Sequence, residues 1–377
     1  SLERGPARSP AMGGGLSSAD APCCCAEVSD RLETLPEARL LEQVNACQES
    51  EASCQVLQWR PLPIPEWPAR SSAAAAALGD GRVLLLGGTD GQSFLQEVWR
   101  RTELGGWQKL PIPPWSARMD AASVTLPSGE VWLVGGESAD REPLREVWCT
   151  GDGGSTWKEL PKPPWNARAR CAVTVLSGSA VLVMGGWGLR GTLLGDVWLT
   201  EDNGHSWVQL SKPAWGPRES ATAMTCEGGL NGIVLLVGGF NPQGQSLAEV
   251  WVSYSRGCSW QSDSHESWPG RGFPVALPTS GSSALILGGV GSGRAIMADV
   301  WSLNVTSGLD WEELPELPFP PRACAAAVVL PGVVMLLGGL GKGNRFLQDA
   351  WCAEVQRPTS QSLSIRQVQL PATLHLK

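Results

Sequence analysis

The sequence predicts an all-β fold built from a repeated unit of about fifty residues. Three observations support this prediction: a turn-rich composition, recurring glycine doublets, and tryptophans that recur with the doublets. The 377 residues include 45 Gly, 29 Pro and 19 Trp, but one Tyr and three His. Such a composition is typical of a protein with many turns and few side chains for acid–base or metal chemistry.

Glycine doublets mark the repeat. Successive doublets are 48, 50, 53, 50 and 50 residues apart, and each ends an apolar run. A Trp follows each doublet after eleven or twelve residues, preceded by an acidic residue and a small apolar one. The doublets are Gly87-Gly88, Gly135-Gly136, Gly185-Gly186, Gly238-Gly239, Gly288-Gly289 and Gly338-Gly339, and the tryptophans are Trp99, Trp148, Trp198, Trp251, Trp301 and Trp351.

A second aromatic series leads to one arginine per repeat. An aromatic residue follows each of six further tryptophans after eight residues, and an arginine follows after three more. The tryptophans are Trp59, Trp107, Trp157, Trp207, Trp260 and Trp311, and the arginines, here called the repeat arginines, are Arg70, Arg118, Arg168, Arg218, Arg271 and Arg322. We expect each repeat arginine to bond to loop carbonyls or to the acidic residue before each Val-Trp, since a guanidinium binds a carboxylate through several donors.

Each repeat predicts four short strands. In the first repeat these are SSAAAAAL (71–78), RVLLLGG (82–88), EVWRRT (97–102) and WQKLP (107–111). The first strand carries small side chains, which suits an innermost strand where sheets converge on an axis. The sequence therefore predicts a six-bladed β-propeller with four-stranded antiparallel blades.

Residues 55–355 resemble the galactose-oxidase-type kelch repeat, with Val-Trp where that family more often has Tyr. The first outer-strand segment has no doublet before it, and the sixth doublet has no such segment after it. We expect residues 55–62 to form the outer strand of the last blade and close the ring; SLSIRQVQL (362–370) in the tail is the competing candidate. A closed ring leaves no free sheet edge and suits a monomer.

The segments outside the repeats carry separate expectations. Residues 1–54 form a polar leader, predicted to be disordered at its start, with a short amphipathic helix near 36–48. Residues 356–377 are a C-terminal tail. The protein is expected to be cytoplasmic. If Met12 is the initiator, however, Gly13 and the cysteines at 23–25 offer acylation sites that would anchor the leader to a membrane.

Two turns, TGDGGSTW (150–157) and TEDNGHSW (200–207), resemble the Asp-box of sialidases. Repeat phase places both between the third and fourth strands, where the Asp carboxylate is expected to accept backbone N–H bonds and the Trp to pack between blades. Sialidase chemistry needs a Tyr nucleophile near the axis, whereas the single Tyr, Tyr254, is predicted to lie in the third strand of the fourth repeat, away from the axis. The copper site of galactose oxidase needs two Tyr and two His, which the repeats do not supply. We therefore expect that the protein is not an enzyme and that it binds neither a cofactor nor a metal ion.

Strand alternation assigns the second-to-third loops and the fourth-to-first connections to one face, here called face A. The kelch resemblance implies partner binding on this face. Exposed Arg beside aromatic residues is typical of interface hot spots. The candidate partner-binding residues are Arg170, Trp187, Arg190, Phe240, Asn241, Arg294 and Arg345. Trp187 and Phe240 either form one apolar patch or pack on neighbouring loops.

Two carboxylates, Asp120 and Glu219, come directly after their repeat positions and are expected to line the channel mouth. They support an alternative hypothesis, a carbohydrate-binding or carbohydrate-acting propeller that uses the channel mouth. The net charge of −8, with scattered Lys and Arg, argues against nucleic-acid binding. The leading hypothesis is a non-enzymatic protein–protein interaction module.

Overall fold

The fold is all-β in the part of the chain that the structure describes. The computed structural model describes residues 58–228, 232–263, 268–279, 283–305 and 309–354. Over these residues it contains β-strands and four three-residue 3-10 turns, and no α-helix. The predicted helix at 36–48, the acylation sites and the tail 356–377 lie outside the described residues.

The first three repeats each form one four-stranded antiparallel sheet whose strands follow chain order. The first sheet is β2 (Ala74–Ala77), β3 (Val83–Leu86), β4 (Val98–Arg101) and β5 (Trp107–Lys109). The second is β7 (Ala122–Thr125), β8 (Val131–Val134), β10 (Val147–Thr150) and β11 (Lys158–Glu159). The third is β12 (Ala172–Val175), β13 (Val181–Trp187), β14 (Leu193–Thr200) and β15 (Val208–Gln209).

The fourth and fifth sheets follow the same order, and the sixth takes its outer strand from the other end of the chain. The fourth is β16 (Thr222–Cys226), β17 (Ile233–Val237), β18 (Val250–Ser253) and β19 (Gln261–Asp263). The fifth is β20 (Val275–Pro278), β21 (Ser283–Leu287), β22 (Val300–Asn304) and β23 (Asp310–Leu314). The sixth is β25 (Ala326–Leu330), β26 (Val333–Leu337), β29 (Ala350–Glu354) and β1 (Trp59–Pro61), in which Trp59 pairs with Ala353.

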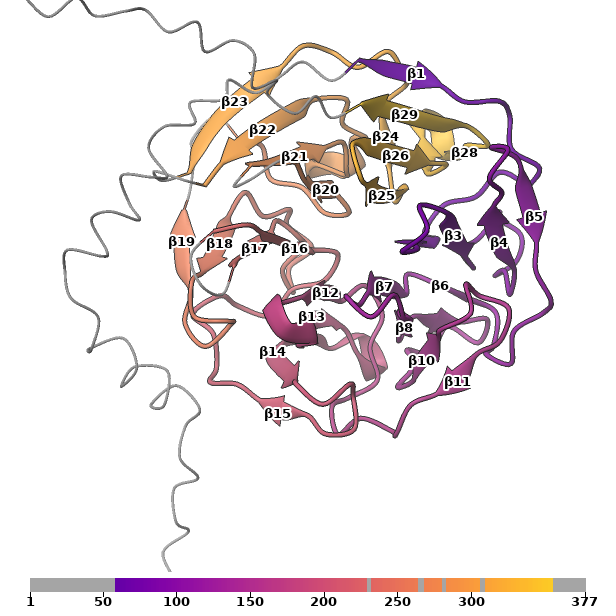
Figure 1. Ribbon diagram of the computed structural model, residues 1–377. Helices are drawn as coiled ribbons and strands as arrows, with labels where there is room; N and C mark the ends of the chain where they lie inside the picture. The colour runs from indigo at the N-terminus through magenta and orange to yellow at the C-terminus, as the bar shows by residue number, and fades with distance from the viewer. Residues whose placement is uncertain (1–57, 229–231, 264–267, 280–282, 306–308, 355–377) are drawn as a thin grey trace, which may run out of the picture. The chain divides into compact units, whose positions relative to one another are not determined.

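The six sheets succeed one another around a common centre, which is compatible with a β-propeller (Figure 1). The small-residue first strand of each sheet is innermost and contacts the first strands of its two neighbours, in the order β2, β7, β12, β16, β20, β25 and back to β2. Alanines in β2 and β12 allow this approach because larger side chains would collide near the axis.

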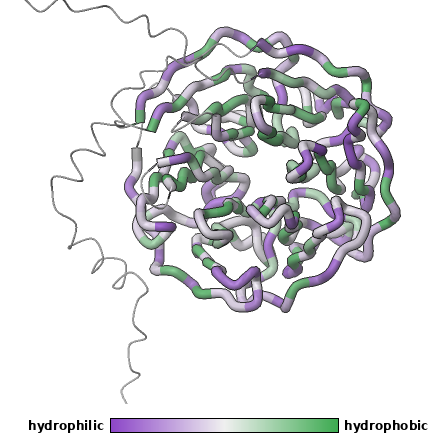
Figure 2. Tube along the Cα trace, in the orientation of Figure 1, coloured by the Kyte–Doolittle hydropathy of each residue, from purple (hydrophilic) through white to green (hydrophobic). Residues whose placement is uncertain are grey.

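Each hydrophobic core lies between two adjacent sheets. The second strands are buried on both faces, so that Leu84 packs with Val131 of the second sheet. Val83, one residue earlier, faces the other way and packs with Met335 of the sixth sheet. Figure 2 shows hydrophobic stretches along the interior strands and more hydrophilic stretches along the outer strands. The continuous apolar runs before each glycine doublet are thus explained by double-sided burial.

Every repeat arginine is buried and holds its own sheet together. In the third sheet, Arg168 donates from Nη1 to the Gly185 carbonyl at 2.9 Å and forms a bidentate ion pair with Asp196. The Trp198 indole donates to the same carboxylate, and the Arg168 guanidinium lies 4.9 Å from the Trp165 ring centroid. The equivalent ion pairs are Arg70–Glu97, Arg118–Glu146, Arg218–Glu249, Arg271–Asp299 and Arg322–Asp349. The predicted structural role of these arginines is confirmed.

The backbone of each repeat arginine also joins its sheet to the preceding one. The carbonyl of Arg271 accepts a hydrogen bond from the Gly239 amide at 2.8 Å. Both glycines of that doublet have positive φ, and a Cβ on Gly238 would lie 2.3 Å from the same carbonyl. The same amide-to-carbonyl bond recurs at all six doublets, including Gly339 to Arg70. The doublets are therefore required by close backbone approach as well as by conformation.

The turns between third and fourth strands contact the neighbouring sheets through their Trp side chains, as predicted. Asp152 accepts from the Thr156 amide at 2.9 Å, and Trp157 packs edge-on against Trp115. In the fourth sheet Ser255 replaces the Asp and accepts the Ser259 amide at 2.8 Å. Tyr254 is exposed and lies one residue beyond β18, rather than within the third strand as the sequence suggested.

Gly238→Ala is expected to lower the free energy of unfolding by at least about 2 kcal/mol, because the methyl group would meet the Arg271 carbonyl and the residue keeps a positive φ. Gly79→Ala is the matched control, since nothing lies within 4 Å of its Cβ position. That control should be neutral or stabilising by up to about 1 kcal/mol. Urea unfolding followed by Trp fluorescence measures both, and equal stabilities would contradict the role assigned to the doublet.

Acid should remove stability that Glu97 provides. Burial raises the pKa of Glu97, but hydrogen bonds from Lys109, Trp99 and Arg70 outweigh it and lower the pKa to about 2. Because the folded-state pKa lies below the unfolded one, this contribution is present above about pH 5 and is lost as the pH falls toward 2. In urea titrations between pH 7 and pH 3, the stability gap between wild type and Glu97→Gln should shrink with acid. The exposed Glu103, substituted by Gln, should show no such gap.

Candidate functional site

Six backbone positions encircle the centre of face A. Each lies two residues after a repeat arginine and adopts a left-handed conformation, with φ between 51° and 58°, although none is glycine. The six, here called the mouth ring, are Ser72, Asp120, Arg170, Ser220, Phe273 and Cys324. The left-handed conformation is uncommon in non-glycine residues, and residues that adopt it are concentrated at functional sites.

Backbone hydrogen bonds link the mouth ring from sheet to sheet. The Arg170 amide donates to the Asp120 carbonyl at 2.9 Å, and the Ser220 amide donates to the Arg170 carbonyl at 2.9 Å. Three further bonds of this kind join Asp120 to Ser72, Phe273 to Ser220, and Ser72 to Cys324. The scaffold of the site is therefore the same in each sheet, whereas the side chains differ.

The second-to-third loops lie beside the mouth ring. The residue between a repeat arginine and the ring position pairs with the residue after the glycine doublet, as in the bridges Ala169–Trp187 and Glu219–Phe240. In two sheets the pairing extends to short strands, which are β6 (Arg118–Met119) with β9 (Glu137–Ser138), and β24 (Arg322–Ala323) with β27 (Leu340–Gly341) and β28 (Arg345–Phe346). Both kinds of loop thus share face A.

A cavity of about 180 Å³ opens at the mouth ring. All six ring residues line it, together with small residues from the first strands such as Ala121 and Ala221. Burial raises the pKa of the Cys324 thiol to about 12, so this thiol stays protonated and unreactive near neutral pH. The cavity is polar on the side of Asp120 and Arg170 and apolar on the side of Phe273 and Pro274.

Arg170 is the centre of the charged cluster at the mouth. Its Nε donates to Asp120 at 2.9 Å, its Nη1 to Glu219 at 3.0 Å, and its Nη2 to Glu137 at 3.1 Å. Burial favours the neutral guanidine, but the charges of Asp120 and Glu219 outweigh it and raise the pKa of Arg170 above its usual value. Arg170 therefore remains charged and holds three carboxylates from different loops at fixed positions.

The cluster carries more negative than positive charge. Asp120, Glu137 and Glu219 contribute −3, and Arg170 and Arg141 contribute +2, which leaves −1 at neutral pH. Arg141 pairs with Glu137 at 3.2 Å from outside, with a side chain that is 68% exposed. Asp120 and Glu219 both bond to the same guanidinium, so they are not positioned as the free acid–base pair that glycoside hydrolysis requires.

Sequence patterns located Asp120, Arg170 and Glu219 but missed Glu137, Ser220 and Phe273. Glu137 directly follows a glycine doublet, at the position that Trp187 and Phe240 occupy in their sheets. The repeat pattern could have identified Glu137, because the residue after each of the six glycine doublets pairs with the residue that precedes a mouth-ring position. What the sequence did not show is that Arg170 reaches across to this position in the preceding sheet.

The two predicted aromatic residues pack on the mouth ring. The Arg170 guanidinium lies 5.4 Å from the Trp187 ring centroid. The Phe240 ring lies edge-on to Phe273 at 6.2 Å and covers Gly272, where a Cβ would lie 2.0 Å from a ring atom. Both rings are partly buried. These contacts favour packing on neighbouring loop residues over a freely exposed apolar patch.

The predicted arginines of the loops lie on the rim of face A. Arg190 lies in the 3-10 turn η2 (Leu189–Gly191), Arg294 ends η3 (Ser292–Arg294), and Arg345 follows η4 (Lys342–Asn344). All three are exposed, and among the described residues none makes an ion pair. Asn241 instead stabilises its own loop by accepting the Gln243 and Gln245 amides.

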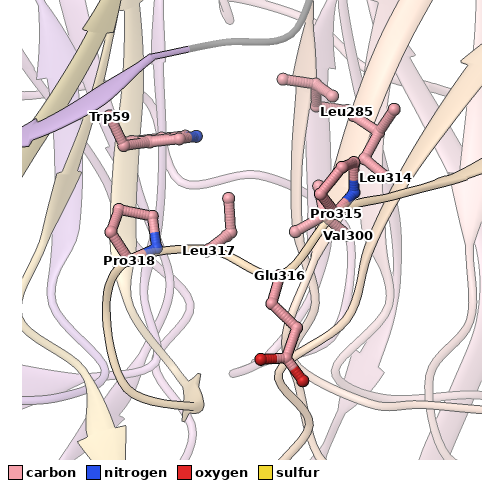
Figure 3. A pocket seen from close by; sticks show the side chains of 8 residues that line it. All are labelled: Trp59, Leu285, Val300, Leu314, Pro315, Glu316, Leu317 and Pro318. Atoms are coloured by element: carbon pink, nitrogen blue, oxygen red, sulfur yellow. The ribbon is translucent and has the colours of Figure 1, made fainter.

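A second cavity lies between the fifth sheet and β1 (Figure 3). It measures about 70 Å³ and is lined by Trp59, Leu285, Val300, Leu314, Pro315, Glu316, Leu317 and Pro318. The side chain of Glu316, its single charged residue, extends away from the apolar side chains in Figure 3. The Trp59 ring contacts Phe319 edge-on at 5.1 Å, which makes this cavity part of the packing at the β1 strand.

Comparison with protein families and with curated proteins identifies no match to this chain. Among the described residues, none of the helical turns has the length and apolar character needed to cross a membrane.

Arg170→Met should lower the free energy of unfolding by about 3–5 kcal/mol, because three partly or fully buried carboxylates would lose their common cation. Arg190→Met, on the neighbouring exposed turn, should stay within about 0.5 kcal/mol of wild type. Urea unfolding at pH 7 measures both. Equal stability of the two variants would show that Arg170 does not organise the cluster.

Proposed function

We propose that this chain is a six-bladed kelch-type β-propeller, closed by β1, that binds a protein partner through face A. The proposal rests chiefly on unpaired cations on the rim of that face. The repeat arginines and Arg170 all bond to carboxylates. By contrast, the exposed side chains of Arg190, Arg294, Lys342 and Arg345 have no such partner among the described residues.

These four cations form an interaction surface of defined charge. They belong to the second-to-third loops of the third, fifth and sixth sheets. Arginine contributes strongly to protein interfaces because its planar guanidinium binds carboxylates through several donors. The partner surface that best complements this rim carries Asp and Glu side chains. Attraction at a solvent-exposed rim mainly accelerates association and weakens as salt is added.

The alternative, a carbohydrate-acting propeller, receives less support from the mouth. Its two candidate carboxylates share one guanidinium, and the Cys324 thiol is protonated. A binding function is therefore preferred over hydrolysis, and the residues proposed to contact the partner are those of the rim.

Affinity purification of the full chain followed by mass spectrometry tests the proposal. The triple variant Arg190→Glu/Arg294→Glu/Arg345→Glu should reduce the recovery of a specific partner by at least about tenfold, because each substitution replaces attraction by repulsion. The charge-matched control is Arg60→Glu/Arg82→Glu/Lys158→Glu, at exposed or half-exposed positions outside face A. That control should retain the partner. Unchanged recovery with the rim variant would refute binding through face A.

A further inference from the structure

We propose that the cavity at the mouth ring binds the side chain of a basic residue, Lys or Arg, supplied by the partner. This inference rests on the proposed protein-binding function and specifies the chemistry of its central contact. It follows from three features of the mouth: its excess negative charge, an unpartnered buried hydroxyl, and walls suited to an alkyl chain.

The charge at the mouth favours a cation. The cluster of Asp120, Glu137, Glu219 and Arg170, together with Arg141 that pairs with Glu137, has a net charge of −1. Arg170 uses one oxygen of Asp120 and one of Glu219, so each carboxylate retains a second oxygen as a hydrogen-bond acceptor. Asp120 also lines the cavity. A second cation in the cavity would meet the second oxygen of Asp120, which Arg170 already holds in place, and this reduces the entropy lost on binding.

A buried hydroxyl beside this charge lacks a partner. Ser220 is 5% exposed and lines the same cavity, and its Oγ makes no hydrogen bond. Leaving a buried hydroxyl unpaired is unfavourable. A hydroxyl oxygen can accept from an ammonium or guanidinium group. Ser220 therefore supplies an acceptor that the fold itself does not use.

The remaining walls suit the aliphatic part of a Lys or Arg side chain. Ala73, Ala121, Ala221 and Ala325 surround the cavity, and Phe273 forms one side of it. Long basic side chains bury their methylene groups against apolar surface while the charged group keeps polar partners. The Arg170 guanidinium lies 6.0 Å from the centroid of the Phe273 ring.

The charge pattern of face A then defines the partner segment more closely. The centre is negative, and the rim at the third, fifth and sixth sheets carries the unpaired cations Arg190, Arg294, Lys342 and Arg345, whereas exposed Asp140 and Glu142 lie on the loop of the second sheet. The complementary segment has one basic residue at its centre and acidic residues toward the third, fifth and sixth sheets. Such a pattern rejects segments that are uniformly acidic or uniformly basic, because each would place like charges together.

Calorimetric titration of the full chain with n-butylammonium, the end of a lysine side chain, tests the cavity directly. We expect saturable binding with a millimolar dissociation constant, and none with n-butanol or methyl α-galactoside. Asp120→Asn should weaken binding at least tenfold, whereas Asp140→Asn, on an exposed loop of face A, should leave it unchanged. No saturable binding, equal binding of butanol, or no effect of Asp120→Asn would overturn the inference.

Ser220→Ala separates binding from folding. This variant removes an unpaired hydroxyl, so the protein should unfold at the same or a higher urea concentration than wild type. Binding of n-butylammonium should nevertheless weaken at least threefold. Wild-type affinity in a folded Ser220→Ala variant would overturn the assigned role of this residue.

The two proposals fail in different ways. If partner recovery falls with the rim variant but is insensitive to Asp120→Asn and Ser220→Ala, the cavity proposal is wrong and binding through face A stands. If recovery is insensitive to the rim variant, binding through that rim is wrong, whatever n-butylammonium does. Recovery lost in all of these variants, with the exposed-surface controls unaffected, supports both.

Discussion

The repeat arginine is the interaction on which the rest of the structure depends. Its side chain bonds to a glycine carbonyl and a carboxylate in its own sheet, and its carbonyl accepts an amide from the doublet of the preceding sheet. One buried residue thus sets both the shape of a sheet and its distance from the next. Each guanidinium is buried, so a missing ion pair or carbonyl bond would leave charged donors without a partner. This requirement explains why the glycine doublet, the acidic residue and the arginine recur as a set.

The mouth ring shows how a uniform scaffold produces a specific site. Its six backbones share one conformation and successive hydrogen bonds, but its side chains include an acid, a base, a phenyl ring and a thiol. Function is therefore expected where the repeat is broken rather than where it is kept. Arg170 is the one cation among the six mouth-ring residues, and it binds carboxylates from three loops.

The functional proposals assign different tasks to two zones of face A. The rim cations, exposed and unpaired, suit long-range attraction and the exclusion of wrong partners. The mouth, preorganised by Arg170 and bearing an unpartnered Ser220 hydroxyl, suits one short-range contact of defined chemistry. A rigid β-scaffold favours this division, because the two zones keep their spacing without an ordering step on binding.

Local spacing in the sequence was sufficient to predict the all-β fold, the six similar units, the innermost small-residue strands and the bonds of the repeat arginines. Those features depend on residues within one or two repeats, so periodicity reports them. The pairing of Trp59 with Ala353 was also predictable, because one outer-strand segment lacked a sheet. Only the tertiary structure decided the site. The contacts of Arg170 with Glu137 and Glu219, and the unpaired Ser220 hydroxyl, arise where three sheets converge. A repeat pattern does not show how far, or in which direction, a single side chain extends at such a point.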